Sequence, residues 1–194
     1  MTSDEALMLE FQRGSREAFD ELFGRYREPI YRFFRRRLAD RGRAEDLSQE
    51  TFLAVIKANT RYEPRALVRT YLYGIALNLL AAERRRQVKD EQRTDCDAEP
   101  TIAASSEEAV WVRQALDRLE RSEREILMLR EYEQLTYVEI GELLKIPVNT
   151  VRSRLFRARM AMRGYLRAEV GVAGPAVNED PTNAGNLKSA ENEA

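Results

Sequence analysis

The 194-residue chain contains no histidine and one cysteine, Cys96. Without histidine there is no imidazole base and no His-ligated metal, and a single thiol excludes a disulfide framework and a cysteine-based zinc site. Long apolar runs are also missing, because the best one, 71–82, is shorter than the ~20 residues that span a bilayer. No signal-peptide apolar core opens the chain. We therefore expect a soluble, cytoplasmic protein that has no catalytic site, metal or cofactor.

An excess of charge of one sign is lacking too, because 32 basic residues stand against 33 acidic ones and the net charge is −1. This balance is an average over opposite segments. Residues 1–90 carry +4 and residues 111–170 carry +3, whereas 91–110 carry −5 and 171–194 carry −3. Basic blocks are typical of nucleic-acid-binding domains, although solvated helix faces in an arginine-rich protein give similar counts.

The spacing of apolar residues is helical nearly throughout, and neither a strand pattern nor an internal repeat occurs. One apolar stripe predicts a helix that begins after Ser15 and that Pro29 kinks or splits. Further helices are predicted over 44–58 and 68–86, with a loop at 59–67 between them. The expected fold class is all-α, with two small helical domains.

Composition separates these domains by a linker and adds a tail. The polar, acidic linker has no apolar period and is expected to be flexible, and the aromatic-free tail is expected to be disordered. The predicted boundaries are 1–88 for the N-terminal domain, 89–104 for the linker, 105–170 for the C-terminal domain and 171–194 for the tail. Two serine–glutamate pairs at capping-box spacing predict helix starts in the C-terminal domain: Ser105 with Glu108, and Ser122 with Glu125.

The strongest local signal is the stretch 135–162, LTYVEIGELLKIPVNTVRSRLFRARMAM. Thr136 and Glu139 form a predicted capping box for a short helix, which Pro147 ends. Asn149 is the predicted N-cap of a second helix. A short helix, a tight turn and a second helix make the helix-turn-helix that a major-groove reader requires, although an ordinary helical hairpin shares the pattern.

The second helix of this motif has an apolar face and a basic one. At 100° per residue Val151, Leu155 and Ala158 point inward. Arginine pairs with guanine edges, serine and threonine contact bases or phosphates, and the helix N-terminus offers free N–H groups to a phosphate. The polar face consists of Thr150, Ser153, Arg154 and Arg157, flanked by Arg152, Arg159 and Arg163.

Two faces in the N-terminal block are candidate binding surfaces. The first combines acids, an amide and a leucine on helix 44–58, which suits a protein partner and equally a plain solvated face. The second lies on helix 68–86, where Tyr71, Asn78 and Arg85 recur every seven residues and Tyr73 lies nearby. Aromatics beside arginines can stack on unpaired bases, but core packing also explains both tyrosines. The first face consists of Asp46, Gln49, Glu50, Leu53 and Lys57.

At this point four stretches of the chain resemble the bacterial RNA polymerase sigma factors, most closely the small extracytoplasmic-function group. That group has two helical domains and a linker. The resemblance covers about residues 5–168 and rests on DELFGRYREPIYRFFRRR, AEDLSQETFLAVIKA, RTYLYGIALNLL and LERSEREILMLREYEQLTYVEIGELLKIPVNTVRSRLFRARMAM.

This resemblance implies three binding surfaces and an anti-sigma partner, with no small-molecule substrate. The coiled coil of the largest polymerase subunit would contact Asp46, Gln49, Glu50 and Leu53. The melted minus-ten element would be read as single-stranded DNA by Lys57, Arg61, Tyr62, Arg65, Tyr71, Asn78 and Arg85. The minus-thirty-five element would be read as duplex by Asn149, Thr150, Arg152, Ser153, Arg154 and Arg157.

The sequence departs from the family at a few positions. Gly74 and Leu77 stand where the family is often basic, which weakens the expected DNA contact of that helix. Lys145 stands where a turn glycine is usual, so we expect it to adopt the left-handed conformation that glycine favours.

The leading hypothesis is therefore a promoter-specificity subunit that acts only with core polymerase. The alternative is a polymerase-independent helix-turn-helix regulator whose N-terminal helices dimerise or sense a signal, and which would bind palindromic duplex tightly. An enzyme is disfavoured, because the sequence has no histidine and no visible phosphate-binding glycine-rich loop, and no paired carboxylates stand out beyond solvated helix faces.

Overall fold

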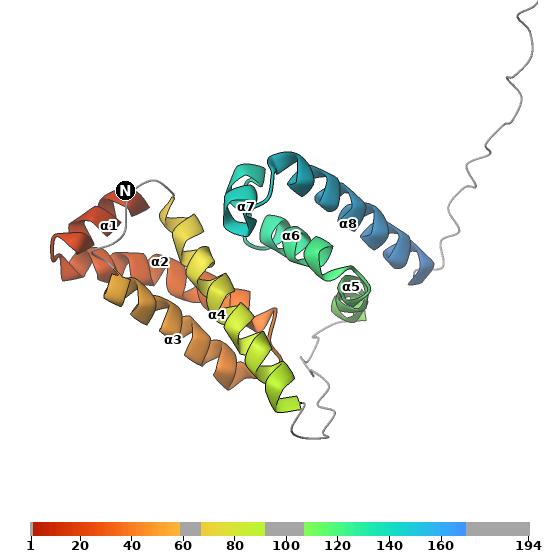
Figure 1. Cartoon of the computed structure of the whole chain (residues 1–194), viewed down its shortest axis with the longest axis horizontal. Coiled ribbons are helices and arrows are strands. Elements are labelled where there is room, and N and C mark those ends of the chain that lie inside the picture. Colours follow the sequence, from red (N-terminus) through yellow and green to blue (C-terminus); the bar gives the residue numbers. More distant parts are fainter. Residues whose placement is uncertain (1, 59–66, 92–106, 170–194) are drawn as a thin grey trace, which may run out of the picture.

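The computed structural model describes residues 2–58, 67–91 and 107–169, and all regular structure in these ranges is α-helical, which confirms the predicted fold class (Figure 1). Within the same ranges no helix is both long and apolar enough to cross a membrane. Most of the predicted loop and linker, the Ser105 cap, Cys96 and the predicted tail lie outside the described residues. The helices are α1 (Asp4–Gln12), α2 (Arg16–Arg35), α3 (Arg41–Ala58), α4 (Val68–Glu91), α5 (Glu107–Asp117), α6 (Arg121–Glu131), α7 (Tyr137–Leu144) and α8 (Val148–Glu169).

Helices α1 to α4 form the N-terminal bundle, in which each helix packs on the next along the chain (Figure 1). Phe33 lies at the centre, with its ring centroid 5.2 Å from that of Phe34 and 5.6 Å from that of Tyr73. Full burial of an aromatic or aliphatic side chain contributes about 1.5–3 kcal/mol. Burial of these rings therefore fixes how α2 and α4 cross.

Serine caps begin the first two helices. Ser15 Oγ accepts a hydrogen bond from the backbone N–H of Ala18, which confirms the predicted start of α2. Ser3 does the same for α1, whose first turn also carries Asp4. Helix α1 was not predicted, although a serine cap followed by acids is a readable start signal.

Helix α2 runs through Pro29 without a break, so of the two predicted effects, a kink or a split, the split is wrong. Proline removes one backbone hydrogen bond and clashes with the preceding turn. Ile30 and Phe33, which follow it, are both completely buried. Burial of the stripe on both sides of the proline outweighs the local cost.

Two other boundaries differ from the predicted ones. Helix α3 begins three residues early, at Arg41, where Asp40 Oδ1 accepts a hydrogen bond from the backbone N–H of Arg43. Helix α4 continues to Glu91, five residues beyond the predicted helix end at residue 86. Lysine and glutamate are good helix formers, which explains why polar residues extend the helix.

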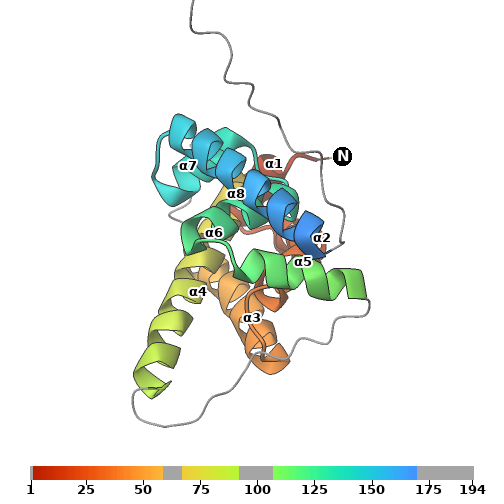
Figure 2. The same ribbon diagram turned by 90° about the vertical axis from the view of Figure 1, so that its right-hand side faces the viewer.

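Helices α5 to α8 form the C-terminal bundle, in which α8 packs on the other three (Figure 2). The predicted start of α6 at Ser122 is wrong, because α6 begins at Arg121 with Glu120 as its N-cap. The Glu120 carboxylate accepts from the backbone N–H of Ser122 at 3.0 Å. Glu125, the predicted capping partner, instead forms an ion pair with Arg37 of the other bundle.

The helix-turn-helix folds as the sequence predicts, except at one cap. Thr136 and Glu139 make both bonds of the capping box, and α7 ends at Leu144. Lys145 adopts the predicted left-handed conformation, with φ 55° and ψ 46°. Asn149 is not the N-cap of α8, which already begins at Val148. Instead, the Pro147 carbonyl accepts from the N–H groups of residues 150 and 151, so the turn itself starts the helix.

We predict that Lys145→Gly raises the unfolding free energy of the chain by about 1 kcal/mol, since a left-handed residue with a Cβ costs about 1–2 kcal/mol. Gly141→Ala is the opposite test in the same turn, because a Cβ there would lie 3.0 Å from the Ile146 carbonyl oxygen and push the turn open. Urea denaturation of the two variants measures both effects. Loss of stability in Lys145→Gly would contradict the turn geometry.

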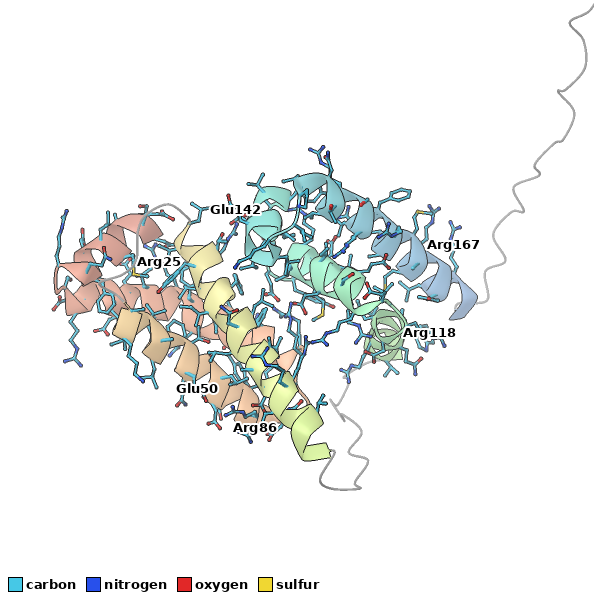
Figure 3. All side chains as sticks on the ribbon, in the orientation of Figure 1. Arg25, Glu50, Arg86, Arg118, Glu142 and Arg167 are labelled. Carbon is cyan, nitrogen blue, oxygen red and sulfur yellow. The ribbon has the colours of Figure 1, made fainter. Side chains whose placement is uncertain are left out.

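The two bundles, whose side chains Figure 3 draws as sticks, are joined by buried ion pairs between residues that follow α2 and Glu133, which follows α6. The Glu133 carboxylate accepts from Arg36 Nη2 at 2.7 Å and from Arg37 Nη1 at 3.0 Å. The side chains of Arg37 and Glu133 are each only 1% exposed. Such a pair is stable only while both partners stay in place, so it fastens the two bundles together.

A second polar contact joins α4 to α7. Glu139 accepts from Arg69 Nη2 at 2.7 Å and from Thr70 Oγ1 at 3.3 Å, while it also serves the Thr136 cap. Burial alone would raise the pKa of Glu139, but the hydrogen bonds from Arg69 and Thr136 outweigh it and the net shift is downward. The carboxylate is therefore ionised when it bridges the bundles.

Candidate nucleic-acid interface

The outer side of α8 carries most of the residues predicted to read duplex DNA. Asn149, Arg152 and Ser153 are exposed, whereas Thr150 and Arg154 are partly buried. Ser153 Oγ donates to the Thr150 carbonyl at 3.1 Å, which leaves its oxygen free to accept. The first turns of one helix thus bring these side chains together.

Ion pairs to α6 hold two other arginines of α8. Arg157 Nε donates to Glu123 Oε1 at 2.8 Å, and the Glu123 side chain is only 16% exposed. Arg159 Nη2 donates to Glu131 at 2.6 Å, in a pair that is about half exposed. Arg157 belongs to the predicted reading set, but in this structure it would have to leave Glu123 to reach a base.

Phe156 is an exposed aromatic on the same side of α8 that was not predicted from the sequence. Its exposed fraction is 66%, the largest among the exposed hydrophobic residues of the described ranges. It lies four residues after Arg152 and three after Ser153, so the three side chains are neighbours. Apolar side chains can contact the thymine methyl group in the major groove. The same count of 100° per residue that places Ser153 on the exposed side of the helix could also have placed Phe156 there.

Arg154 turns toward the N-terminal bundle and lines a cleft of about 370 Å³ between the bundles. Leu77 and Ala81 of α4 form the facing wall. A cleft of this size accommodates a small molecule and not a duplex. Arg154 of α8 and Leu77 of α4 therefore line the same cleft, in which Arg154 is partly buried.

The two tyrosines of α4 have different surroundings. Tyr73 is buried against Phe33, and burial raises its pKa to about 12. Tyr73 is therefore a core residue. Tyr71 is partly buried, and burial raises its pKa as well, yet part of its ring remains accessible for stacking. The sequence left open whether the two tyrosines stack on bases or pack in the core, and the structure decides this for Tyr73 only.

The remaining minus-ten candidates lie on the side of α4 that faces the C-terminal bundle, at the end of α3, or outside the described residues. A Cβ on Gly74 would contact Leu143 of α7 at 3.5 Å. Asn78 and Arg85 are exposed and lie within ~60° of Gly74 around the helix. Lys57, at the end of α3, is exposed too. The candidates outside the described residues are Arg61, Tyr62 and Arg65.

The candidate protein-binding face of α3 is exposed, with Leu53 at 51%. Gln49 and Asp46 are exposed beside it. Arg43 lies 3.2 Å from Glu50 and 3.7 Å from Asp46, and it also pairs with a buried carboxylate of α4. An exposed leucine among ordered carboxylates is suited to a protein partner, because apolar contact and charge complementarity act together.

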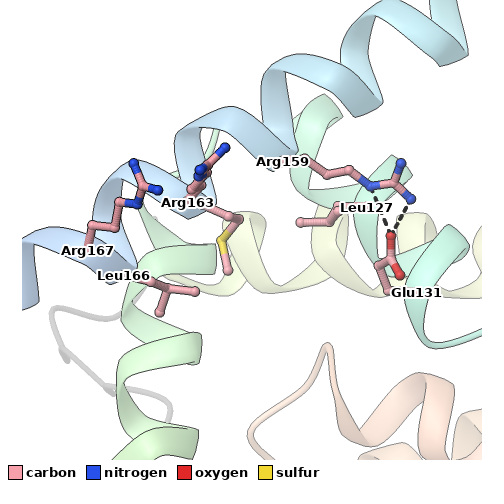
Figure 4. Close-up of a pocket in the computed structure, with 7 residues that line it drawn as sticks. Leu127, Glu131, Arg159, Arg163, Leu166 and Arg167 are labelled. Atoms are coloured by element: carbon pink, nitrogen blue, oxygen red, sulfur yellow. Dashed lines mark hydrogen bonds and ion pairs between the residues drawn. The ribbon is translucent and has the colours of Figure 1, made fainter. Parts of the chain in front are cut away.

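A groove of about 650 Å³ runs between α6 and α8 (Figure 4). Leu127, Met162 and Leu166 supply apolar walls, and Arg163 and Arg167 lie along the rim. This side of α8 is roughly opposite the Arg154 side, so DNA and a protein could use α8 at once. In the described ranges no group of three or more histidine, cysteine, aspartate or glutamate side chains is suited to holding a metal ion.

Two family models match the chain, each within one bundle. The Sigma-70 region 2 model matches residues 22–89, and the Sigma-70, region 4 model matches residues 109–162. Among curated relatives, the RNA polymerase sigma-H factor of Pseudomonas aeruginosa is 34% identical over 176 residues, covering 82% of this chain and 91% of the relative. The ECF RNA polymerase sigma factor SigW of Bacillus subtilis is 30% identical over 174 residues, covering 80% and 92%.

Two solved structures share the fold. One is CnrH in complex with the cytosolic domain of CnrY, with a TM-score of 0.69 at 24% identity over 87% of this chain and 99% of that one. The other is the sigma factor RpoE with the anti-sigma factor NepR from Bartonella quintana, with a TM-score of 0.68 at 20% identity over 78% and 98%. At these identities the likeness concerns the fold alone.

Proposed function

Because the chain belongs to the extracytoplasmic-function group of RNA polymerase sigma factors, we propose that it binds core RNA polymerase and directs initiation at promoters that its two bundles read. In this proposal α3 binds the polymerase, α4 reads the minus-ten element as a single strand and α8 reads the minus-thirty-five element as duplex. A sigma factor selects promoters and leaves the chemistry to the polymerase.

The main support for the proposal is that each of the two matched sigma regions contains an exposed candidate binding face. The region 2 match contains α3 with its leucine and carboxylates, together with the Tyr71 side of α4. The region 4 match contains the helix-turn-helix, with its capping box and its basic second helix. Arg152 and Ser153 are exposed on the first turns of that helix, and arginine and serine side chains can form hydrogen bonds with base edges and phosphates.

Promoter binding also requires the two bundles to separate. The faces of α4 and α8 line one cleft of about 370 Å³, which does not admit a duplex. We therefore infer that the structure represents a closed form, and that the polymerase stabilises an open one. A ligand shifts such an equilibrium by its preference for one form, so tight binding to core polymerase drives opening.

Control by an anti-sigma factor is the second part of the proposal. The two structural neighbours were solved with the cytosolic domain of CnrY and with the anti-sigma factor NepR. The groove between α6 and α8, with apolar walls and a basic rim, suits an amphipathic acidic helix of such a partner. A partner that holds the closed form would keep Arg154 and the facing side of α4 from DNA.

The double variant Asp46→Ala/Gln49→Ala tests the polymerase contact. Both side chains are exposed, so the variant should fold normally while its affinity for purified core polymerase falls by roughly tenfold or more. Fluorescence anisotropy of the labelled chain measures this affinity, and circular dichroism monitors the fold.

The matched control is Asp20→Ala/Gln114→Ala, which removes an exposed acid and an exposed amide from other helices. It should bind core polymerase like the unmodified chain. Equal binding by the first double variant would refute the assignment of the α3 face. Tight binding of palindromic duplex by the unmodified chain without polymerase would instead favour an independent regulator.

A further inference from the structure

Arg43, in the first turn of α3, contacts carboxylates from two helices. Its Nη1 donates a hydrogen bond to Glu50 Oε1 at 3.2 Å, and the same nitrogen lies 3.7 Å from Asp46 Oδ2. Its Nη2 donates to Glu83 Oε2 of α4 at 2.8 Å. Glu50 and Asp46 belong to the candidate polymerase-binding face, whereas Arg43 and Glu83 lie outside the set predicted from the sequence. One guanidinium group therefore links that face to the neighbouring helix.

The contact with Glu83 anchors this guanidinium group. The Glu83 side chain is only 4% exposed, and its other oxygen accepts from Gln87 Nε2 at 3.3 Å. The hydrogen bond with Glu83 is also the largest of the effects that raise the pKa of Arg43. A buried carboxylate becomes very costly once its partner leaves, so Arg43 stays with Glu83 when other charges approach.

The opposite end of Arg43 reaches the surface, where it restrains exposed carboxylates. The side chain of Arg43 is 22% exposed, that of Glu50 43% and that of Asp46 63%. A long exposed side chain samples several rotamers, and a binding event that fixes it costs conformational entropy. Arg43 contacts one of the two Glu50 oxygens. The contact therefore orders Glu50 without using the second oxygen, which can accept a hydrogen bond from a partner.

We propose that Arg43 is a positioning residue for the polymerase contact. Anchored by Glu83, it holds the carboxylate of Glu50, and less closely that of Asp46, in the orientation in which α3 binds core polymerase. A guanidinium group suits this task, because its fork presents two Nη ends to two acceptors at once. The inference rests on the proposed function and goes beyond it, since polymerase affinity then depends on a residue that acts through another side chain.

The opposite effect would follow if Arg43 only neutralised the two carboxylates. Its removal would then make the α3 face more negative and would strengthen binding to a basic partner, since charge complementarity would improve. Loss of a positioning contact weakens binding instead. The two possibilities therefore differ in the sign of the change in affinity.

Fluorescence anisotropy of the full chain with purified core polymerase tests the proposal in the double variant Arg43→Gln/Glu83→Gln. Both charges are removed together, so no buried charge is left without its partner and the variant should fold. We expect binding weaker by about three- to tenfold, because Glu50 must then be ordered at the moment of binding. Arg43→Lys is a second variant, which keeps a charge opposite Glu83 but lacks the fork, and it should weaken binding too. Circular dichroism monitors the fold of both.

A double-mutant cycle with Glu50→Gln separates positioning from a purely structural role. Glu50→Gln alone should weaken binding on the order of tenfold, since it removes the charge that the partner meets. In that background Arg43→Gln/Glu83→Gln should weaken binding by at most about twofold more, because the side chain through which Arg43 acts is already changed. Equal weakening in both backgrounds would show that the pair only supports the bundle, which contradicts the proposal.

The matched control is Glu28→Gln/Arg32→Gln, which makes the same chemical change in an exposed ion pair of α2. It should bind core polymerase like the unmodified chain, and weakening equal to that of Arg43→Gln/Glu83→Gln would overturn the proposal. Unchanged or tighter binding by the folded Arg43 variants, while Glu50→Gln still weakens it, would refute the positioning role and leave the polymerase contact standing. Unchanged binding by Glu50→Gln would overturn both the positioning role and the assignment of Glu50 to the polymerase contact.

Discussion

Glu133→Ala should detach the two bundles from each other while each bundle stays folded. Two arginines of the N-terminal bundle share this carboxylate, and Arg37 beside it is 1% exposed. Removal of one partner from a buried ion pair typically costs about 3–5 kcal/mol, because the remaining charge is left without compensation. Since Glu133 follows α6 and its partners lie after α2, the cost falls on the contact between bundles.

Small-angle scattering should detect this separation as a larger radius of gyration for Glu133→Ala. The same variant should bind promoter duplex more tightly than the unmodified chain, because the cleft that closes off Arg154 is opened. Glu131→Ala is the matched control, two residues away. Its pair with Arg159 is about half exposed and contributes at most about 1 kcal/mol. Identical scattering for the two variants and the unmodified chain would show that Glu133 does not hold the closed form.

Arg154→Ala should lower specific initiation by roughly ten- to a hundredfold, because one bidentate arginine–guanine pair discriminates by about 1–3 kcal/mol. Arg154 is a better candidate for this contact than Arg157, since Glu123 already holds Arg157 at 2.8 Å. A residue that reads a base also relaxes sequence preference at one position, whereas a phosphate contact weakens all sequences alike. The variant should therefore lose preference at a single base pair of the minus-thirty-five element.

Selection from a randomised minus-thirty-five library, with core polymerase present, measures this preference. Arg163→Ala is the control, because it removes the same charge from the groove side of α8. It should leave the base preference unchanged. An Arg154→Ala variant that weakens every sequence equally would assign Arg154 to the phosphate backbone.

Local signals explain which parts of the fold could be predicted. Ser15 and the Thr136–Glu139 box each place their acceptors within three residues of the helix start, so the sequence alone reveals them. The left-handed Lys145 was predictable from the family resemblance, since the family usually has glycine at this turn position. Such features depend on neighbours along the chain and not on distant packing.

Other local signals were misleading because several residues competed for one role. Ser122 and Glu125 have capping-box spacing, but Glu120 reaches the first turn instead, and Glu125 pairs with Arg37. Asn149 is a good N-cap by type, yet the Pro147 carbonyl already starts α8. A spacing rule does not reveal which of two adjacent candidates the tertiary structure uses.

The relation between the two bundles could not be predicted at all. The contacts of Glu133 with Arg36 and Arg37 join residues that are 97 and 96 positions apart. In the sequence these arginines are part of a basic block and appear to be a solvated or DNA-binding run. Charge counts by segment identified two basic domains, but only the structure reveals that arginines of one are neutralised by glutamates of the other.

Mapping of RNA 5′ ends, with purified core polymerase and fragmented genomic DNA, measures promoter-specific initiation by this chain most directly. Addition of the chain should produce discrete start sites that share a minus-ten and a minus-thirty-five motif, and Asp46→Ala/Gln49→Ala should abolish them. Start sites that do not change when the chain is added would contradict its role as a promoter-specificity subunit.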